Sequence, residues 1–333
     1  MPQRDDLLLG VDGGNTKTIA LVARDDGIVV GVGTAGCADM HNAASPGHAL
    51  DEIVRAASTA LEAAGARAGD LNAAAFSLAG ADWPEDFEFL RGGLAEQLEL
   101  VVEPVVVNDA IGAIRSGTDD GVGVAAVCGT GGAIGARNSR GEIFHLGFWP
   151  DGTGAFALGS EGLAAVWRAG IGVGPDTSLT ARALARWECA DSISLLHAFT
   201  RIGGLGDSRT ARGLFADAVL DEAAAGDQVA HDIVELAGRH LGDYARVCAA
   251  QTGQVGSPFP LVLAGGVLRH TSTLLRESIL GRVPDAVPVY PVVEPVAGAV
   301  LLAADEVGAR PDLERLGATA PTILASSEPR GEG

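Results

Sequence analysis

The sequence predicts an α/β protein of two duplicated halves, residues 1–117 and 118–308, that face each other across a cleft. Each half begins with three short apolar strands, and a glycine-rich turn joins the first two of them. Each half then alternates between segments typical of helices and of strands. The 333 residues, 47% of them apolar, are also sufficient to fill two hydrophobic cores.

The first half is predicted as a three-stranded meander followed by alternating helices and strands. The meander strands are expected at 7–12, 18–23 and 28–33, because apolar runs there are separated by polar turns. The remaining elements are expected as a helix at 46–64, a strand at 73–78, a helix at 84–97, a strand at 101–107 and a short helix after Asn108.

The second half repeats this order around a long helical insertion at about 160–252. Its strands are expected at 122–128, 133–137, 142–146, 261–264 and 287–290, and its last two helices at 271–280 and 296–307. Such repetition indicates a duplication at the level of the fold. Residues 309–333 are rich in Pro, Ser, Gly and charge, and we expect a frayed tail there.

Charge and cysteine content exclude several classes of protein. The formal net charge is −20, with acidic residues spread along the chain, which disfavours nucleic acid and anionic membranes as partners. The cysteines show no C-x-x-C pair, so a disulfide framework or a zinc ribbon is not expected. There is no signal sequence and no apolar run long enough to span a bilayer, and we therefore expect a cytoplasmic protein.

The first glycine-rich turn, Asp12-Gly13-Gly14-Asn15-Thr16-Lys17-Thr18, has the composition of a phosphate site. Glycines let backbone N–H groups approach an anion, the threonine hydroxyls add donors, and Asp12 can hold a hydrated cation. Lys17 is the only lysine among 23 basic residues. The alternative is an ordinary hairpin whose lysine points to solvent.

A second glycine turn, Gly129-Thr130-Gly131-Gly132, lies at the equivalent point of the second half, so two such turns should face each other across the cleft. Asp109 follows a buried strand and begins a helix. A carboxylate at that position can accept the proton of an attacking hydroxyl and orient it toward a γ-phosphate. The alternative role for Asp109 is to cap the helix.

These motifs resemble those of the sugar kinase/actin/Hsp70 ATPase superfamily and, within it, the N-acetylglucosamine kinase and BadF/BadG/BcrA/BcrD ATPase family. The similarity extends over about residues 7–305. The matching stretches are the turn at 12–18 (phosphate 1), Val107-Asn108-Asp109-Ala110 (connecting), the turn at 129–132 (phosphate 2), Leu263-Ala264-Gly265-Gly266-Val267 (adenosine) and Ser77-Leu78-Ala79-Gly80-Ala81-Asp82.

The resemblance implies two ribonuclease H-like (actin-like ATPase) domains that use ATP and Mg²⁺ to phosphorylate a small sugar, in a chain that could form a homodimer. It implies an amino-sugar kinase acting on the 6-hydroxyl of glucosamine or N-acetylglucosamine, with Asp109 as the base and Asp12 at the metal. Nucleotide would contact residues 12–18, Gly129, Thr130, Gly131, Gly132, Gly265 and Gly266. The acceptor would contact Asp39, His41, Asn42, Asn108, Asp109, Ser160 and Glu161.

The chain departs from this family on the acceptor side. Family kinases carry Asn where this chain has Asp39, and an acidic residue where it has Ser160. They also carry a Gly-Trp-Gly turn where this chain reads Gly152-Thr153-Gly154. A carboxylate at position 39 would suit a cationic acceptor such as free glucosamine better than an acetamide.

The motifs leave other functions open. A kinase of another small sugar fits the same motifs. An activator ATPase of the same family would need cysteines that share an iron–sulfur cluster, for which only Cys128 is suitably placed, and an actin-like assembly protein would not need Asp109. The G-x-G-x-x-G match at 31–36 follows the third strand and precedes a loop, so a dinucleotide-binding fold is not expected.

Overall fold

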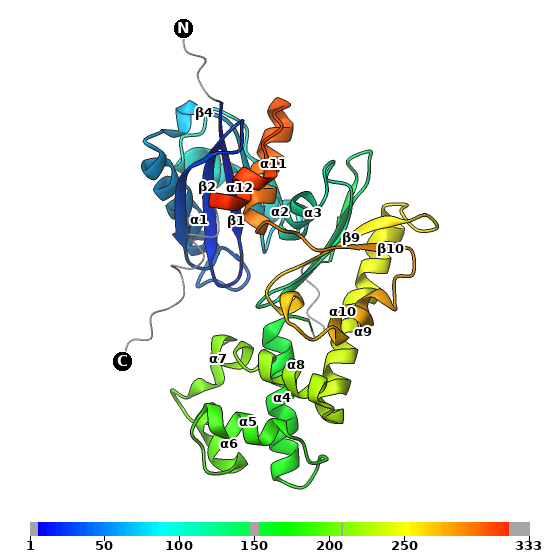
Figure 1. Ribbon diagram of the computed structural model, residues 1–333. Helices are drawn as coiled ribbons and strands as arrows, with labels where there is room; N and C mark the ends of the chain where they lie inside the picture. The colour runs from blue at the N-terminus through cyan, green and yellow to red at the C-terminus, as the bar shows by residue number, and fades with distance from the viewer. Residues whose placement is uncertain (1–5, 147–152, 208, 320–333) are drawn as a thin grey trace.

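The computed structural model describes residues 6–146, 153–207 and 209–319 of the chain. It consists of two mixed five-stranded sheets with helices packed on both faces of each sheet, as Figure 1 shows. The predicted α/β architecture of two similar halves is therefore confirmed.

The first half forms the predicted elements, with small changes at their ends. Its elements are β1 (Leu7–Gly13), β2 (Thr18–Arg24), β3 (Val29–Ala35), α1 (Pro46–Ala64), a 3-10 turn (Ala68–Asp70), β4 (Leu71–Leu78), α2 (Pro84–Gln97), β5 (Val105–Asn108) and α3 (Asp109–Gly117). Strand β5 begins at Val105 rather than at 101, because the chain is still turning after α2, where Glu99 has a left-handed backbone with φ 53°.

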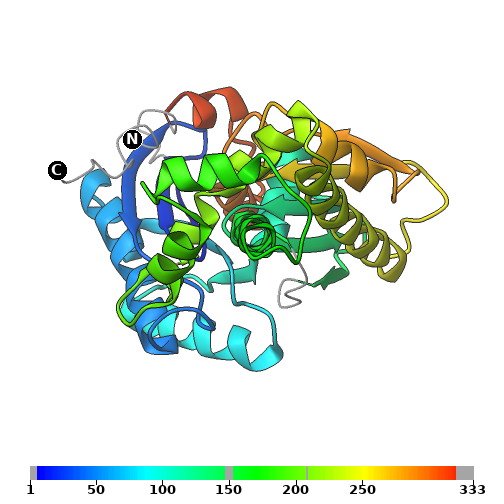
Figure 2. The same cartoon turned by 90° about the horizontal axis from the view of Figure 1, so that it is seen from below.

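The second half contains the predicted insertion, which begins at Ala155 and comprises six α-helices. Its first part forms β6 (Gly123–Cys128), β7 (Gly132–Arg137), β8 (Ile143–His145), α4 (Ala155–Gly170), α5 (Leu179–Arg186), α6 (Ser192–Thr200), a 3-10 turn (Leu205–Asp207), α7 (Arg209–Gly213), α8 (Ala216–Ala225) and α9 (Gln228–Gln251). Its last part forms β9 (Phe259–Ala264), a 3-10 turn (Val267–Arg269), α10 (Leu274–Leu280), β10 (Ala286–Val289), α11 (Pro295–Val307) and α12 (Leu313–Thr319). Figure 2 shows α4 to α8, in green, in front of the junction between the two sheets.

The two sheets have matching topologies. Their strand orders are β3-β2-β1-β4-β5 and β10-β9-β6-β7-β8. In each, the first three strands form an antiparallel meander, and the later strands add in parallel beside the first strand of the meander. Parallel strands end at the same edge, so the carboxyl ends of β1, β4 and β5 bring their following turns together.

Local signals account for the helix ends that the sequence predicted best. Helix α1 has the predicted bounds because the Ser45 hydroxyl accepts the N–H of His48 at 3.1 Å and Pro46 occupies the first turn. Gly65 ends the helix in the left-handed conformation, with φ 63°.

The last helix of each half covers the sheet of the other half. Helix α3, which ends the first half, packs against β6, β7 and β9, and its Ile111 and Ile114 form a cluster with Val262. Helix α11, which ends the second half, packs against β1 and β4, where Val300 joins Leu8 in a separate cluster. The predicted division between residues 117 and 118 stays a prediction, since each half is completed by a helix of the other.

Glycines allow these two helices to approach closely. A Cβ on Gly298 of α11 would overlap the backbone of Gly112 on α3, and a Cβ on Gly10 would overlap the backbone of Val300. The guanidinium of Arg115, buried on α3, donates to the carboxylate of Asp305 on α11 at 2.9 and 3.1 Å. Helices α3 and α11 are therefore fixed to each other, as well as each to the sheet of the other half.

The expectation of a frayed tail from 309 onward is wrong for its first part. Helix α12 packs on the first sheet, with Leu316 fully buried beside Leu8 and Ile19, and Arg315 pairs with Asp26 at 3.2 Å. The overall polar composition of the tail did not indicate that a single apolar residue, Leu316, would join this core. Residues 320–333 lie outside the described part of the chain.

The glycines of the G-x-G-x-x-G match have a packing role. Gly31 and Gly33 lie in β3, where a Cβ on either would overlap carbonyl oxygens of α1, at Ala60 and Ala56. They let α1 lie directly on the strand, and this explains the motif without a dinucleotide.

Candidate active site

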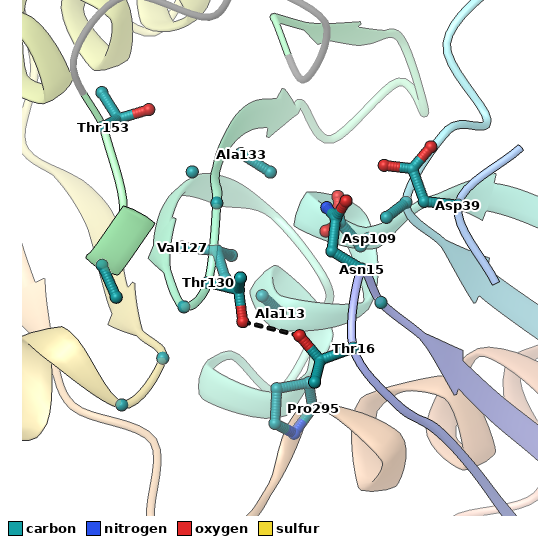
Figure 3. Close-up of a pocket in the computed structure, with 18 of the residues that line it drawn as sticks. Asn15, Thr16, Asp39, Asp109, Ala113, Val127, Thr130, Ala133, Thr153 and Pro295 are labelled. Carbon is teal, nitrogen blue, oxygen red and sulfur yellow. Dashed lines mark hydrogen bonds between the residues drawn. The ribbon is translucent and has the colours of Figure 1, made fainter. Parts of the chain in front are cut away.

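A cleft of about 1000 Å³ lies between the two sheets at the glycine hairpins. Most of the predicted site residues line it, as Figure 3 shows in part. They are Asp12, Gly14, Asn15, Thr16, Lys17, Asp39, His41, Asn42, Asn108, Asp109, Gly129, Thr130, Gly131, Gly132, Gly265 and Gly266. Gly13, Thr18, Ser160 and Glu161 are not among the lining residues.

The first hairpin is a tight turn whose shape depends on Gly13 and Thr18 behind it. The Gly14 N–H donates to the carbonyl of Lys17 at 2.9 Å and closes the turn. Thr18 is buried and its hydroxyl donates to the carbonyl of Gly36 at 2.8 Å, while a Cβ on Gly13 would lie 2.6 Å from Ala38 Cβ. These two residues support the turn, and Gly14 to Lys17 face the cleft.

The second hairpin is held by the start of helix α4. The N–H groups of Ala155 and Phe156 donate to the carbonyls of Gly129 and Thr130 at 2.8 and 3.0 Å. Gly154 precedes them with φ 90°, in close contact with Gly131. The start of α4 therefore fixes the turn, and both line the cleft, where the turn presents its backbone and the Thr130 hydroxyl.

The two hairpins meet across the cleft. The hydroxyls of Thr16 and Thr130 are 2.8 Å apart, the dashed contact in Figure 3, and they join residues 114 positions apart in the sequence. The sequence predicted that the turns would face each other, and the contact places them at one point of the cleft.

The wall beyond the second hairpin is the turn after β9. Gly265 has φ 98°, and a Cβ there would overlap the backbone of Cys128 at the end of β6. A Cβ on Gly266, by contrast, would meet no protein atom within 4 Å, so this residue leaves an open face on the cleft. An aromatic ring can therefore lie against the backbone at Gly266.

Asp109 is the first residue of α3, and the helix cap is supplied by its neighbour. The Asn108 side chain accepts the N–H of Ala110 at 3.1 Å, which is the capping bond. Asp109 Oδ1 is a buried atom without a hydrogen-bond partner among the described residues. Burial, followed by the charge of Asp12 and then those of Asp82 and Asp39, raises the pKa of Asp109 to about 7.

Asp12 lies at the end of β1 and has a similarly perturbed carboxylate. Burial raises the pKa of Asp12 to about 7, the charge of Lys17 opposes the rise and that of Glu294 adds to it. The half-buried carboxylates of Asp12 and Asp109 offer the oxygen ligands that Mg²⁺ prefers. The residues present at Asp12 therefore fit a magnesium ion. Lys17 is exposed but lines the cleft, so it does not simply point to bulk solvent.

The loop after β3 brings Asp39, His41 and Asn42 to the opposite end of the cleft. Asp39 accepts the backbone N–H of His41 at 2.9 Å through Oδ1 and the amide of Asn42 at 2.5 Å through Oδ2. His41 Nε2 lies 3.2 Å from Asp86 Oδ2 on α2. The loop therefore holds its own shape through the carboxylate of Asp39.

Asp82 and Trp83 also line this end of the cleft, and the predicted site did not include them. The amide of Asn108 donates to Asp82 Oδ1 at 3.1 Å. Burial, with the charges of Asp39 and Asp86, raises the pKa of Asp82 to about 6, while the charge of His41 opposes the rise. The signal that could have found them is their position just after the carboxyl end of β4, which is next to β1 in the sheet.

Ser160 and Glu161 are on helix α4, away from the cleft lining. Glu161 is exposed and lies 3.8 Å from Arg168, and Ser160 Oγ is buried without a hydrogen-bond partner among the described residues. Of the neighbouring loop, Gly152 lies outside the described residues, whereas Thr153 lines the cleft. The binding roles predicted for Ser160 and Glu161 stay predictions.

Glu294 and Arg269 form an ion pair near the turn at Gly266, and both line the cleft. The guanidinium of Arg269 donates to both carboxylate oxygens of Glu294, at 2.5 and 3.3 Å. Arg269 follows the turn at Gly266 and Glu294 precedes α11, so the pair joins the second sheet to the helix that covers the first. No local sequence pattern predicts this pair, because the two residues are 25 positions apart.

Comparison with known proteins is consistent with this geometry. Residues 9–303 match the BadF/BadG/BcrA/BcrD ATPase family. An N-acetyl-D-glucosamine kinase of Dictyostelium discoideum is 25% identical over 317 residues, which cover 90% of this chain and 98% of that protein.

Two solved structures share the fold. A Chromobacterium violaceum protein provisionally named N-acetylglucosamine kinase superimposes with a TM-score of 0.68 at 20% identity, over 90% of this chain and 99% of that one. A ROK family glucokinase from Streptomyces griseus, in complex with glucose and AMPPNP, has a TM-score of 0.56 at 18% identity, over 89% and 98% of the two chains.

Proposed function

The chain belongs to the BadF/BadG/BcrA/BcrD ATPase family, and from this premise we propose that it is an ATP-dependent kinase that transfers the γ-phosphate to the 6-hydroxyl of an amino sugar, glucosamine or N-acetylglucosamine. The observation that carries the proposal is Asp109, a half-buried residue whose buried Oδ1 has no hydrogen-bond partner among the described residues, in the same cleft as two glycine hairpins. The similarity to the Dictyostelium N-acetyl-D-glucosamine kinase over almost the whole of both chains supports it.

The nucleotide end would bind ATP mainly through the main chain. The hairpins at Gly14 and Gly131 offer N–H groups and the hydroxyls of Thr16 and Thr130 to the phosphates. The open backbone at Gly266 would accept the adenosine. Asp12 would hold Mg²⁺, which would supply charge neutralisation at the phosphates when bound.

Asp109 would act as the general base. Its first-turn position on α3 fixes the carboxylate, and the Asn108 cap leaves the side chain free for the acceptor. The carboxylate would accept the proton of the sugar hydroxyl as that oxygen attacks the γ-phosphorus and the bond to ADP breaks. A base whose pKa is near neutrality matches this task at physiological pH.

The activator ATPase alternative is weakened by Cys128. A cluster shared between two copies of the chain needs cysteine ligands at the surface between them, but Cys128 is only 1% exposed. A kinase of another small sugar shares every feature of the nucleotide end and is distinguished only by its acceptor.

The remaining predictions concern location and partners. None of the described helices is both long and apolar enough to cross a membrane. All four cysteines are free thiols, and the net charge is −20. These features support a cytoplasmic enzyme that does not bind nucleic acid. A homodimer stays a prediction.

The test is ATP turnover by the purified chain with Mg²⁺, alone and with a panel of glucosamine, N-acetylglucosamine, glucose and N-acetylmannosamine. We expect ADP release to depend on an amino sugar, and a 6-phosphate product by mass spectrometry and NMR. Turnover that no sugar stimulates would contradict the proposal and favour an ATPase without a small acceptor.

A further inference from the structure

We propose that Asp82, flanked by Trp83, forms the acceptor subsite and selects an aminohexose with a free ammonium group over its N-acetylated or neutral counterparts. This inference rests on the proposed kinase function and names its substrate class. Asp82 ends the matching stretch at 77–82, but the sequence analysis assigned a binding role to neither residue.

Asp39 is the other carboxylate that could bind an ammonium group, but its oxygens are already in use. Oδ1 accepts the His41 N–H and Oδ2 accepts the Asn42 amide, and the residue is only 5% exposed. A Cβ on Gly80 would lie 2.7 Å from Oδ1, so the carboxylate is also packed against backbone. Asp39 therefore shapes the loop and contributes charge at a distance.

Asp82 has the opposite arrangement. Its Oδ1 accepts the Asn108 amide and lies near His145, while Oδ2 accepts no hydrogen bond from the described residues. The side chain is 6% exposed and yet lines the cleft. Asn108 joins this carboxylate to the start of α3, where Asp109 is the next residue. A group bound at Asp82 is thereby positioned relative to the proposed base.

The charges around Asp82 favour a cation. Asp39, Asp86 and Asp109 face it from the β3 loop, from α2 and from α3. His41 pairs with Asp86, and His145 Nδ1 lies 3.9 Å from Asp82 Oδ1, with a pKa that burial lowers. The basic residues that line the cleft are Lys17 and Arg269 at the nucleotide end and His41 at this end. Burial raises the pKa of Asp82, and the charges of Asp39 and Asp86 add to the rise. An ammonium group bound at this carboxylate would supply an opposite charge, whereas an acetamide would not.

Trp83 provides an apolar surface beside this charge. The indole is 46% exposed and lines the cleft next to Asp82. An indole face can pack on a sugar ring and attracts an ammonium group.

The experiment compares kcat/KM for glucosamine, N-acetylglucosamine and glucose, at saturating Mg·ATP, in the wild type, Asp82→Asn and Asp39→Asn. We expect the wild type to prefer glucosamine. In Asp82→Asn the ratio of glucosamine to N-acetylglucosamine should fall about ten- to hundredfold, the range of one charge-assisted hydrogen bond. In Asp39→Asn all three acceptors should lose activity because a shared loop is disturbed, and the ratio should fall much less than in Asp82→Asn because Asp39 contributes charge only at a distance.

Two further variants keep the test decisive. Asp82→Glu preserves the charge, so it should keep the preference for glucosamine even if turnover drops. Trp83→Leu alters an exposed side chain that does not affect the core, and should raise KM for all three sugars. Thermal unfolding of each variant identifies any that fails to fold.

A wild-type preference for a neutral sugar, or equal losses in Asp82→Asn for all acceptors, would overturn the subsite while leaving the kinase intact. A shift of the ratio in Asp39→Asn but not in Asp82→Asn would also overturn it and assign the ammonium to Asp39. Failure of the proposed function looks different, since no sugar would then be phosphorylated by the wild type.

Discussion

The two ends of the cleft are built from different parts of the chain. At the proposed nucleotide end, glycine turns at Gly14, Gly131 and Gly266 expose backbone to the cleft, beside side chains of both charges. At the proposed acceptor end, the carboxylates of Asp39 and Asp82 are among the lining side chains. The first end offers N–H donors on fixed turns, and the second offers side-chain carboxylates.

This difference separates the binding of the phosphates from the selection of the acceptor. Backbone donors are set by the glycine turns and stay in place when neighbouring side chains change. At the acceptor end, by contrast, each carboxylate is a single side chain on its own element. One substitution can therefore change which acceptor is preferred without changing how the phosphates are bound. Specificity should therefore change more easily at the acceptor end than nucleotide binding does at the other.

The largest effect is expected where the two ends meet, at Asp109. Asp109→Asn removes the proposed base while preserving the shape of the residue, so kcat should fall roughly 10²–10⁴-fold with little change in ATP affinity. Steady-state kinetics and calorimetric titration with a non-hydrolysable ATP analogue measure the two quantities. Near-normal turnover would leave Asp109 with a structural role only.

A pH profile sharpens the same point. Because burial and neighbouring carboxylates raise the pKa of Asp109 to about 7, the free enzyme carries a protonated base below that pH. We expect kcat/KM for the sugar to fall about tenfold per pH unit below about 7 and to be level just above it. A profile that stays level down to pH 5 would be inconsistent with this base.

A pair of glycine substitutions tests whether the nucleotide end is made of backbone. Gly265→Ala places a Cβ in a left-handed turn against Cys128, so it should lower the free energy of unfolding by about 1–3 kcal/mol and weaken ATP binding. Gly266→Ala meets no protein atom within 4 Å and has a right-handed helical backbone. It should leave stability unchanged and raise KM for ATP severalfold.

Thermal unfolding and ATP titration of the two variants separate these effects. An ATP affinity unchanged in Gly266→Ala would move the adenosine away from this wall, and the contrast between the two ends of the cleft would weaken.

Lys17 should give the smallest effect. Its ammonium is exposed, and its charge lowers the pKa of Asp12. We expect Lys17→Ala to raise KM for ATP or lower kcat by less than about tenfold, and Lys17→Arg to be close to wild type, since a charge near the phosphates is what matters. If the alanine variant is unaffected, phosphate binding depends on backbone donors alone.

The fold and the place of the glycine turns in the cleft followed from the sequence because their signals are local. Ser45, Pro46 and Gly65 set the bounds of α1, and the glycine turns mark the ends of strands. The proposed acceptor end did not follow, because the contact of Asp82 is with Asn108, 26 residues away, and because the hydrogen bonds of Asp39 within its loop have no sequence signal. The Arg269–Glu294 pair and the docking of Leu316 likewise depend on contacts that no local pattern records.

Because α11 covers the sheet of the other half, the order of synthesis affects folding. As synthesis proceeds from the N-terminus, β1 and β2 emerge early, but the face that carries Leu8 and Ile19 stays bare until α11 and α12 follow. The nascent chain must hold an uncovered apolar sheet through almost its whole length. Truncation before Pro295 should therefore yield insoluble protein, and a circular permutant that begins with α11 should fold sooner during translation.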